Sequence, residues 1–203
     1  MQLYLASRSP RRVELLAQMG LTCQTCPADI DEAVKLNEPP VVYVKRVAHE
    51  KALAAVAQNL TVFNRHIAEQ TNAILLAADT TVAVNGEILG KPIDDADAIN
   101  MLKKLSGQTH EVHTAVAGML ISAQGIGEAI QLLSTTTVTM RVLTPADIAQ
   151  YIASGEHKDK AGSYGIQGLA ATYISHINGS YSGVMGLPVY ETAAMLRGFG
   201  LAI

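Results

Sequence analysis

Residues 73–89 read AILLAADTTVAVNGEIL and hold the two clearest structural signals in the chain. The first six of these residues are continuously apolar, which is typical of a strand buried on both of its faces. Asn85 and Gly86 stand between two short apolar segments, and this dipeptide is the strongest short-range signal for a β-hairpin. We therefore expect a buried strand that ends at Asp79, followed by a tight hairpin.

Asp79 is unusual because an acid that closes a run of apolar residues needs a partner. The hairpin returns the chain to Gly90-Lys91-Pro92, so we expect Asp79 and Lys91 to meet at one end of the sheet. Most charged residues are solvated surface residues, whereas a carboxylate at the end of a buried strand favours a functional role.

Toward the N-terminus, the sequence predicts a strand, a loop and a helix. Residues 3–6 are apolar, Ser9 suits an N-cap, and Pro10 suits the first position of the helix that follows. Arg11 and Arg12 then fall in the first helical turn, where unpaired backbone N–H groups point outward. This arrangement predicts an anion-binding site.

Three further segments lie between that helix and the buried strand. We expect a strand near residues 21–27 and a helix from residue 40 to about residue 57, with Lys51 inside the helix. Residues 59–72 are polar and aperiodic, which predicts an extension of that helix and then a loop. No role follows from the sequence of this segment.

Beyond residue 93, helices and strands interleave without a strict repeat. The expected elements are a helix at 94–105, long strands near 109–122 and 129–142, a helix through Ser154, a strand near 171–177 and a helix from about Pro188. Thr144 and Asp147 have the spacing of a capping box. These elements predict an α/β fold with a mixed β-sheet, in which long antiparallel strands interrupt a doubly wound order.

The composition fits one compact domain over residues 1–203. The chain is 49% hydrophobic and 16% charged, so it can bury a substantial core. Its formal net charge of -3 gives no overall attraction to nucleic acids or anionic membranes, so neither is expected as a partner. The N-terminus does not resemble a signal peptide, and no apolar run reaches the ~20 residues of a membrane span. We therefore expect a cytoplasmic protein.

Cys23 and Cys26 form a Cys-x-x-Cys motif, which occurs in redox pairs and in zinc sites. A structural zinc site usually has four ligands, and the sequence has no second cysteine pair. The alternation around them is that of a strand, which places the two sulfur atoms on opposite faces. We favour a structural role and leave any other purpose of the pair open.

Several cations and carboxylates stand in separate segments at structural boundaries or on apolar elements: Arg12, Lys51, Lys91, Asp31, Glu32 and Asp79. Together they indicate bound phosphate and metal, because triphosphate hydrolysis needs positive charge where negative charge develops on the leaving oxygens. The carboxylates would hold Mg²⁺ or Mn²⁺, hard cations that prefer oxygen ligands.

Six motifs, in order and over nearly the whole chain, closely resemble the Maf family of nucleoside triphosphate pyrophosphatases. They are residues 7–12 (SRSPRR), 49–52 (HEKA), 78–80 (ADT), 90–92 (GKP), 105–110 (LSGQTH) and 159–168 (DKAGSYGIQG). The resemblance implies an elongated mixed β-sheet with flanking helices in two lobes around a central cleft, as in the inosine triphosphate pyrophosphatases. It also implies a homodimer and hydrolysis between the α and β phosphates.

The loop at 159–168 is similar to that of the family branch that acts on dTTP and UTP. The specificity positions of that branch map onto Arg12, Thr80 and Gln167, and the amide of Gln167 offers the donor and the acceptor that a uracil or thymine edge requires. The resemblance makes Asp79 the catalytic proton acceptor, and Glu32, with help from Asp31, a metal-site acid.

Substrate contacts on the phosphates would come from Ser7, Lys51 and Lys91, together with Arg11 and Arg12 at the helix start. Two features depart from the family pattern: position 8 is arginine where glycine is frequent, and the segment 59–72 is longer than usual. Neither departure affects the remaining five motifs.

The resulting hypothesis is a house-cleaning enzyme that hydrolyses dTTP and UTP to the monophosphate and pyrophosphate. An alternative is the same chemistry on modified pyrimidine nucleotides. Asp79 would take a proton from the attacking water or hold the metal that lowers the pKa of that water. The alternative from another class is a regulator of septum formation that binds nucleotide or nucleic acid without turnover. Pure binding gives no reason to place Asp79 beside anionic phosphates.

Overall fold

The computed structural model describes residues 1–203. The strands are β1 (Gln2–Leu5), β2 (Gln24–Thr25), β3 (Ala73–Val84), β4 (Glu87–Leu89), β5 (Thr109–Ser122), β6 (Gly125–Ile126), β7 (Ile130–Met140) and β8 (Ile174–Asn178). The α-helices are α1 (Pro10–Gln18), α2 (Pro40–Gln58), α3 (Leu60–Ala68), α4 (Asp95–Leu105), α5 (Pro145–Ser154), α6 (Tyr181–Met185) and α7 (Val189–Gly198). Short 3-10 helices η1 (Ala161–Ser163) and η2 (Leu169–Tyr173) complete the chain.

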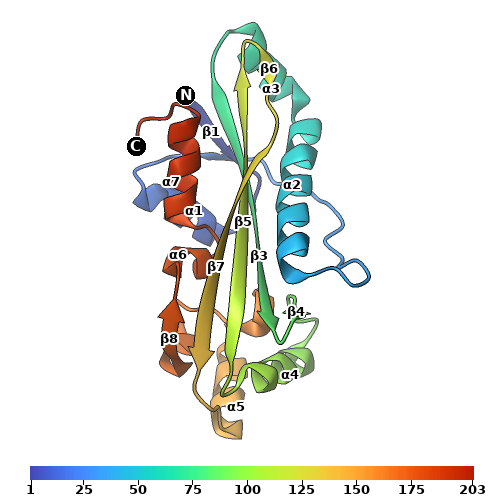
Figure 1. Cartoon of the computed structure of the whole chain (residues 1–203), viewed down its shortest axis with the longest axis vertical. Helices are drawn as coiled ribbons and strands as arrows, with labels where there is room; N and C mark the ends of the chain where they lie inside the picture. The colour runs from blue at the N-terminus through green and yellow to red at the C-terminus, as the bar shows by residue number, and fades with distance from the viewer.

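The eight strands form one elongated mixed sheet in the order β2-β1-β3-β5-β7-β8, with β4 paired to β3 and β6 to β5. The pairs β1–β2 and β1–β3 are parallel, and the remaining pairs are antiparallel. Figure 1 shows β3, β5 and β7 running along the long axis, with α2 on one side and α1 and α7 on the other. The predicted mixed α/β sheet with long antiparallel strands is therefore confirmed.

The two edges of strand β3 are paired differently, and this difference leaves part of one edge open. One edge pairs with β5 from Ala73 through Ala83. The other edge pairs with β1 only at residues 73–76 and with β4 only at residues 82–84. Residues 77–81 therefore have a strand neighbour on one side only, and the opposite edge faces the loops that follow β1 and β4.

The prediction that the buried strand ends at Asp79 is wrong. Strand β3 continues for five residues beyond Asp79, because the apolar residues of 82–84 supply a second buried stretch and pair with β4. The acid thus lies inside the strand, beside its unpaired edge. The hairpin at Asn85 and Gly86 is confirmed, with φ of 51° and 79° and with Val84 opposite Glu87.

The two faces of the sheet bury separate cores. One face packs Leu75 and Ala77 against α2 and α3, and the other packs Ile74 and Leu76 against α1, α6 and α7. Alternation along β3 therefore sends Asp79 to the α2 face, while Thr80 lies on the α1 face.

A third core cluster forms the second lobe. It joins the far ends of β3, β5 and β7 to α4 and α5 through large side chains that include Tyr151, Tyr164 and Tyr173. Figure 1 shows α4 and α5 gathered at one end of the long sheet, away from α3 and the N-terminus. The predicted two-lobed arrangement is confirmed, and Thr144 and Asp147 form the predicted capping box at the start of α5.

Three predicted elements differ from the structure. The strand near 21–27 is reduced to Gln24 and Thr25, and the strand near 171–177 begins only at Ile174, because η2 occupies the preceding residues. The segment 59–72 contains a separate helix, α3, rather than a helix extension. Phe63 of α3 is fully buried, and burying such a side chain contributes about 1.5–3 kcal/mol. This segment is therefore part of the core.

Both cysteines are free thiols. Cys26 is buried in the α2-face core, whereas Cys23 packs against the core on the opposite face. The predicted placement on opposite faces agrees with this packing. No helix of the chain has the length and apolar character that a membrane crossing requires.

Candidate active site

A cleft of about 1180 Å³ lies along the unpaired edge of β3 and is lined by both lobes. Nine of the ten residues predicted for the site line it: Ser7, Arg11, Arg12, Glu32, Lys51, Asp79, Thr80, Lys91 and Gln167. The cleft reaches around the edge of the strand, from Asp79 on one face of the sheet to Thr80 on the other.

Asp31 is the predicted residue that does not line the cleft. Its side chain is exposed, and its Oδ1 accepts a hydrogen bond from the backbone N–H of Ala33, 2.9 Å away. The carboxylate therefore stabilises the turn of its own loop.

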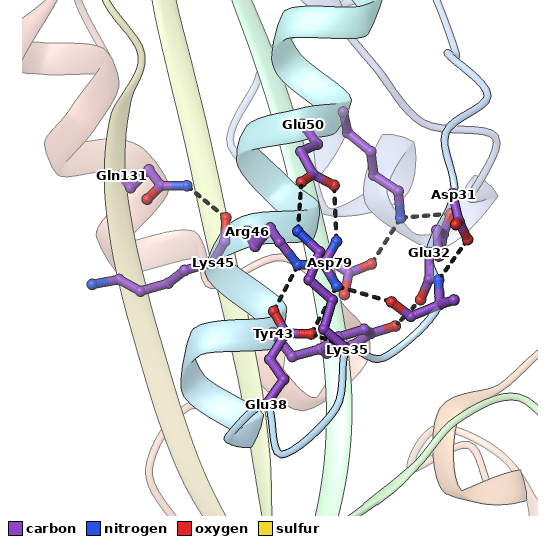
Figure 2. Close-up of polar contacts among 12 residues, drawn as sticks. Asp31, Glu32, Lys35, Glu38, Tyr43, Lys45, Arg46, Glu50, Asp79 and Gln131 are labelled. Carbon is purple, nitrogen blue, oxygen red and sulfur yellow. Dashed lines mark hydrogen bonds and ion pairs between the residues drawn. The ribbon is translucent and has the colours of Figure 1, made fainter.

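Lys51 joins the two carboxylates that do reach the cleft. Its Nζ lies 2.7 Å from Asp79 Oδ1 and 3.0 Å from Glu32 Oε1. Lys51 projects from α2, Asp79 from β3, and Glu32 from the irregular loop that precedes α2. Figure 2 shows Asp79 and Glu32 within one connected set of polar contacts.

Asp79 is held in an environment that opposes its ionisation. The residue is only 6% exposed, and burial raises the pKa of its carboxyl above the ordinary value of 3.8. The charges of Lys51 and Arg12 act in the opposite direction and hold the pKa down, without cancelling the effect of burial. Asp79 is therefore a more basic carboxylate than an exposed aspartate.

Arg12 organises the other face of the strand. Its guanidinium donates to the carbonyl of Gly186 at 2.7 Å, to Ser7 Oγ at 3.1 Å and, in a longer contact of 3.4 Å, to Thr80 Oγ1. Burial lowers the pKa of the Arg12 guanidinium, and the carboxylate of Asp79 acts against that effect. The fixed guanidinium connects α1, β3 and the end of α6.

The start of α1 has the predicted residues at its first positions but not the predicted capping hydrogen bond. Ser9 is the N-cap residue and Pro10 follows it, but the Ser9 hydroxyl makes no capping hydrogen bond. Instead, the backbone N–H of Ser9 donates to Ser7 Oγ at 3.1 Å. Ser7 is buried in the loop after β1, and Arg11 lies beside it at the cleft.

The glycine-rich loop at residues 159–168 carries Gln167 to the cleft and contacts the segment that carries Lys91. Gly162 has φ of +66°, and its N–H donates to the carbonyl of Gly90, which fixes the loop against the residue before Lys91. The loop is anchored by Tyr164, whose hydroxyl lies 2.7 Å from His110 Nε2. Burial lowers the pKa of His110 to about 4, so this histidine is neutral near pH 7.

Sequence reasoning did not identify Arg46, which fixes the loop that carries Glu32. Its guanidinium makes two bonds to Glu38, of 2.6 and 2.8 Å, one to the Ala33 carbonyl at 2.9 Å and one to Glu50 at 2.9 Å. Figure 2 shows Arg46 between Glu38 and Glu50. The hydrogen bond from Arg46 is the main reason that the pKa of Glu38 falls to about 2.

Tyr43 holds the same loop from α2, since its hydroxyl donates to the Glu32 carbonyl at 3.1 Å. The only sequence signal for these supports was a pair of oppositely charged residues, Arg46 and Glu50, four positions apart on the helix.

Several cations at the cleft have no carboxylate partner: Arg11, Arg12, Lys91 and Lys160 make no ion pair, whereas Lys51 makes two. Lys160 belongs to the glycine-rich motif at residues 159–168 and was not predicted as a site residue. It lines the cleft, and its ammonium donates to the backbone carbonyls of Glu156 and Lys158. Uncompensated positive charge in a concave site attracts an anion of several charges.

Glu32 and Asp79 are compatible with a hard divalent cation, because both contact the same ammonium and both offer carboxylate oxygens. The chain contains no cluster of three or more acidic, histidine or cysteine side chains that could hold a metal ion. A Mg²⁺ or Mn²⁺ ion would therefore take its other ligands from water and from phosphate oxygens, as Mg²⁺ commonly does with phosphate substrates.

Fold and cleft together define an α/β protein of mixed-sheet architecture with a cation-lined cleft around a buried carboxylate. The chain belongs to the Maf family: the family model described as "Maf-like protein" matches residues 2–199. The chain is 50% identical to the dTTP/UTP pyrophosphatase of Methylobacillus flagellatus over 202 residues, covering 100% of this chain and 94% of that relative.

It is also 50% identical to the dTTP/UTP pyrophosphatase of Bordetella parapertussis over 206 residues, with the same coverage. Among solved structures, a HAM1 protein from Coxiella burnetii has the same fold, with a TM-score of 0.53 and 15% identity, over 98% of this chain and 99% of that one.

Proposed function

We propose that this protein is a nucleoside triphosphate pyrophosphatase that hydrolyses dTTP and UTP to the monophosphate and pyrophosphate. The observation that carries the proposal is the position of Asp79, a buried carboxylate of raised pKa in a cleft lined by unpaired cations. The names of relatives at 50% identity over the full chain support the same activity and the same pair of substrates.

The unpaired cations neutralise the triphosphate. Arg11 and Arg12 reach it from the start of α1, and Lys91 reaches it from the loop after β4. Ser7 adds a hydroxyl beside Arg12. Fixed positive groups stabilise the charge that accumulates on the leaving pyrophosphate oxygens and need no rearrangement during the reaction.

Asp79 accepts a proton from the water that attacks the bond between the α and β phosphates. A carboxylate of raised pKa is a better proton acceptor than an exposed one, and the charge of Lys51 favours its ionised form. The water oxygen forms its new bond to the α phosphorus, the bond from that phosphorus to the bridging oxygen breaks, and the bridging oxygen leaves with the pyrophosphate. Glu32 and Asp79 would hold Mg²⁺ or Mn²⁺, which supplies further positive charge and lowers the pKa of bound water.

Gln167 and Thr80 contact the base. The Gln167 side chain is exposed, lines the cleft and makes no hydrogen bond within the protein, so its amide is free to offer a donor and an acceptor. A uracil or thymine edge presents the complementary pattern of carbonyl oxygens around an N–H group.

The proposal also includes a cytoplasmic location and a homodimer. Two free thiols fit a reducing compartment, in which the nucleotide pools are also found. The resemblance to the Maf family supports the dimer, and sedimentation of the purified protein tests it.

The test of function is a substrate panel with product analysis. Purified protein is mixed with dTTP, UTP, CTP, ATP and GTP in Mg²⁺ or Mn²⁺, with EDTA as the control, and the products are separated. The proposal expects the monophosphate and pyrophosphate from dTTP and UTP. Tight nucleotide binding without product would favour a regulator without turnover.

A further inference from the structure

Thr114 is a buried residue outside the cleft whose hydroxyl contacts Thr80, a residue that lines it. It lies on β5 directly opposite Thr80 of β3 and is fully buried. Its Oγ1 is 2.8 Å from the carbonyl oxygen of Gly183 and 2.9 Å from Thr80 Oγ1. The Gly183 carbonyl can only accept, so the single hydroxyl proton of Thr114 is committed to that bond.

The direction of the next bond follows from this count of protons. Because Thr114 has no second proton, the bond between the two hydroxyl oxygens requires Thr80 to donate. The contact between Arg12 and Thr80 runs into Thr80, since a guanidinium has no acceptor. Thr80 therefore has no proton left, and its remaining lone pair is all that its oxygen offers to a ligand in the cleft.

Ser7 has the opposite polarity. Its Oγ accepts from the Ser9 backbone N–H and from Arg12, and it donates to no protein group. The Ser7 proton is therefore free for an acceptor such as a phosphate oxygen. Two hydroxyls that both contact Arg12 thus present a donor at one point of the cleft and an acceptor at another.

The geometry points to Thr114 as a specificity-determining residue that fixes Thr80 as a hydrogen-bond acceptor, so that the cleft takes bases with a ring N–H, uracil and thymine, in preference to cytosine. The inference rests on the proposed function, because it assumes that the base lies against Thr80. Uracil and thymine carry a hydrogen at N3, whereas cytosine carries a lone pair there, which would face the lone pair of Thr80. An unpaired polar contact of this kind is a strong means of rejecting a substrate.

The test compares Thr114→Val, Thr114→Ser and wild type on UTP and CTP. In Thr114→Val the Thr80 hydroxyl loses its acceptor, so it can rotate and donate to cytosine N3. The ratio of kcat/KM for UTP to kcat/KM for CTP should then fall about tenfold. Thr114→Ser keeps the hydroxyl and should keep the wild-type ratio. Thr192→Val is the matched control, because Thr192 is fully buried in α7 and its hydroxyl has no partner.

If Thr114 had a merely structural role, Thr114→Val would lower kcat/KM for UTP and for CTP by the same factor. That result would overturn the inference. A wild-type enzyme that cleaves UTP and CTP equally well would also overturn it, while leaving the proposed pyrophosphatase activity intact. Calorimetric binding of UMP and CMP in EDTA measures the same preference without turnover. If no nucleotide is hydrolysed, the proposed function fails, and the UMP to CMP affinity ratio of Thr114→Val against wild type still decides the inference.

Discussion

Lys51 Nζ lies 2.7 Å from Asp79 Oδ1, and this contact joins α2 to the middle of β3 at the point where one edge of the strand is unpaired. The same ammonium lies 3.0 Å from Glu32 Oε1. One cation thereby holds two carboxylates from separate segments near each other and lowers the pKa of the buried one, against the effect of burial. The chemistry of the cleft depends on this balance between burial and charge.

The pH dependence of activity should follow the carboxyl of Asp79. Because its pKa is raised, kcat/KM should fall as the pH drops through a value above 3.8, when Asp79 takes up a proton and can no longer accept one. Lys51→Met removes a charge that lowers this pKa, so the acid limb should move to higher pH, in addition to a lower rate at every pH. Pyrophosphate release measured from pH 4 to pH 9 gives the acid limb of the wild type and of the variant. An unmoved limb in Lys51→Met would argue against Asp79 as the titrating group.

The stability of the folded protein should depend on pH in the opposite direction to activity. The folded-state pKa of Asp79 exceeds its unfolded value, so the folded protein binds more protons and loses stability as the pH rises through the folded pKa. Asp79→Asn mimics the protonated form, and we expect a higher Tm than wild type at pH 7.5. The difference should disappear below about pH 4, where the side chain is protonated in both states. Thermal unfolding followed by circular dichroism checks this, and a variant less stable at pH 7.5 would contradict it.

Arg46 should act through the position of Glu32. Arg46→Lys keeps the charge but loses the planar fork that bonds Glu38 and Ala33, so the loop carrying Glu32 should loosen. We expect kcat/KM to fall about 10–100-fold, as for other residues that orient metal ligands, with a higher concentration of Mg²⁺ at half-maximal rate. Faster proteolysis of residues 29–38 in the metal-free protein is a second readout.

The matched control for Arg46→Lys is Arg141→Lys. Arg141 makes a similar two-bond pair with Asp147, at 2.9 and 2.8 Å, at the start of α5 in the other lobe. This substitution should leave kcat/KM and the Mg²⁺ requirement near the wild-type values. Equal losses in the two variants would mean that Arg46 has no particular connection with the site.

Gly162 tests the glycine-rich loop. Its φ of +66° is costly for other residues, and an added Cβ would lie 2.9 Å from Val82 Cγ1. Gly20 has a similar φ of +75° but no atom within 4 Å of an added Cβ, so Gly20→Ala isolates the backbone cost of about 1–2 kcal/mol. We expect Gly162→Ala to lose kcat/KM by on the order of 10–100-fold, because the loop that presents Gln167 must shift. Urea unfolding and kinetics of both variants, compared side by side, separate strain from displacement, and equal kinetics would contradict the expectation.

Local signals in the sequence were sufficient for much of the fold. The dipeptide at 85–86 determines a tight hairpin by its positive φ angles, and the Thr144–Asp147 spacing determines a capping box, so both could be predicted. The end of β3 could not, because Asp79 and the two threonines after it look like a strand terminus in sequence. The pairing of 73–83 with β5 and of 82–84 with β4 shows that the strand continues.

The candidate site shows the same division. Charged residues at element boundaries, with the family motifs, indicated the nine residues that line the cleft. The direct partner of Asp79 is Lys51 rather than the neighbouring Lys91, and that pairing depends on how α2 packs on the sheet. Arg46 was not found because its role depends on how the irregular loop before α2 folds back onto that helix. Thr114 was not found because it resembles any buried strand residue, and its role follows from bonds between distant segments.

The most direct measurement of the central claim is single-turnover hydrolysis of UTP by Asp79→Asn beside wild type, with folding verified by circular dichroism and UTP binding measured in EDTA. The account predicts a folded variant that binds UTP but releases pyrophosphate about 10²–10⁴-fold more slowly, because the proton acceptor is gone. A folded Asp79→Asn protein that releases pyrophosphate at the wild-type rate would contradict it.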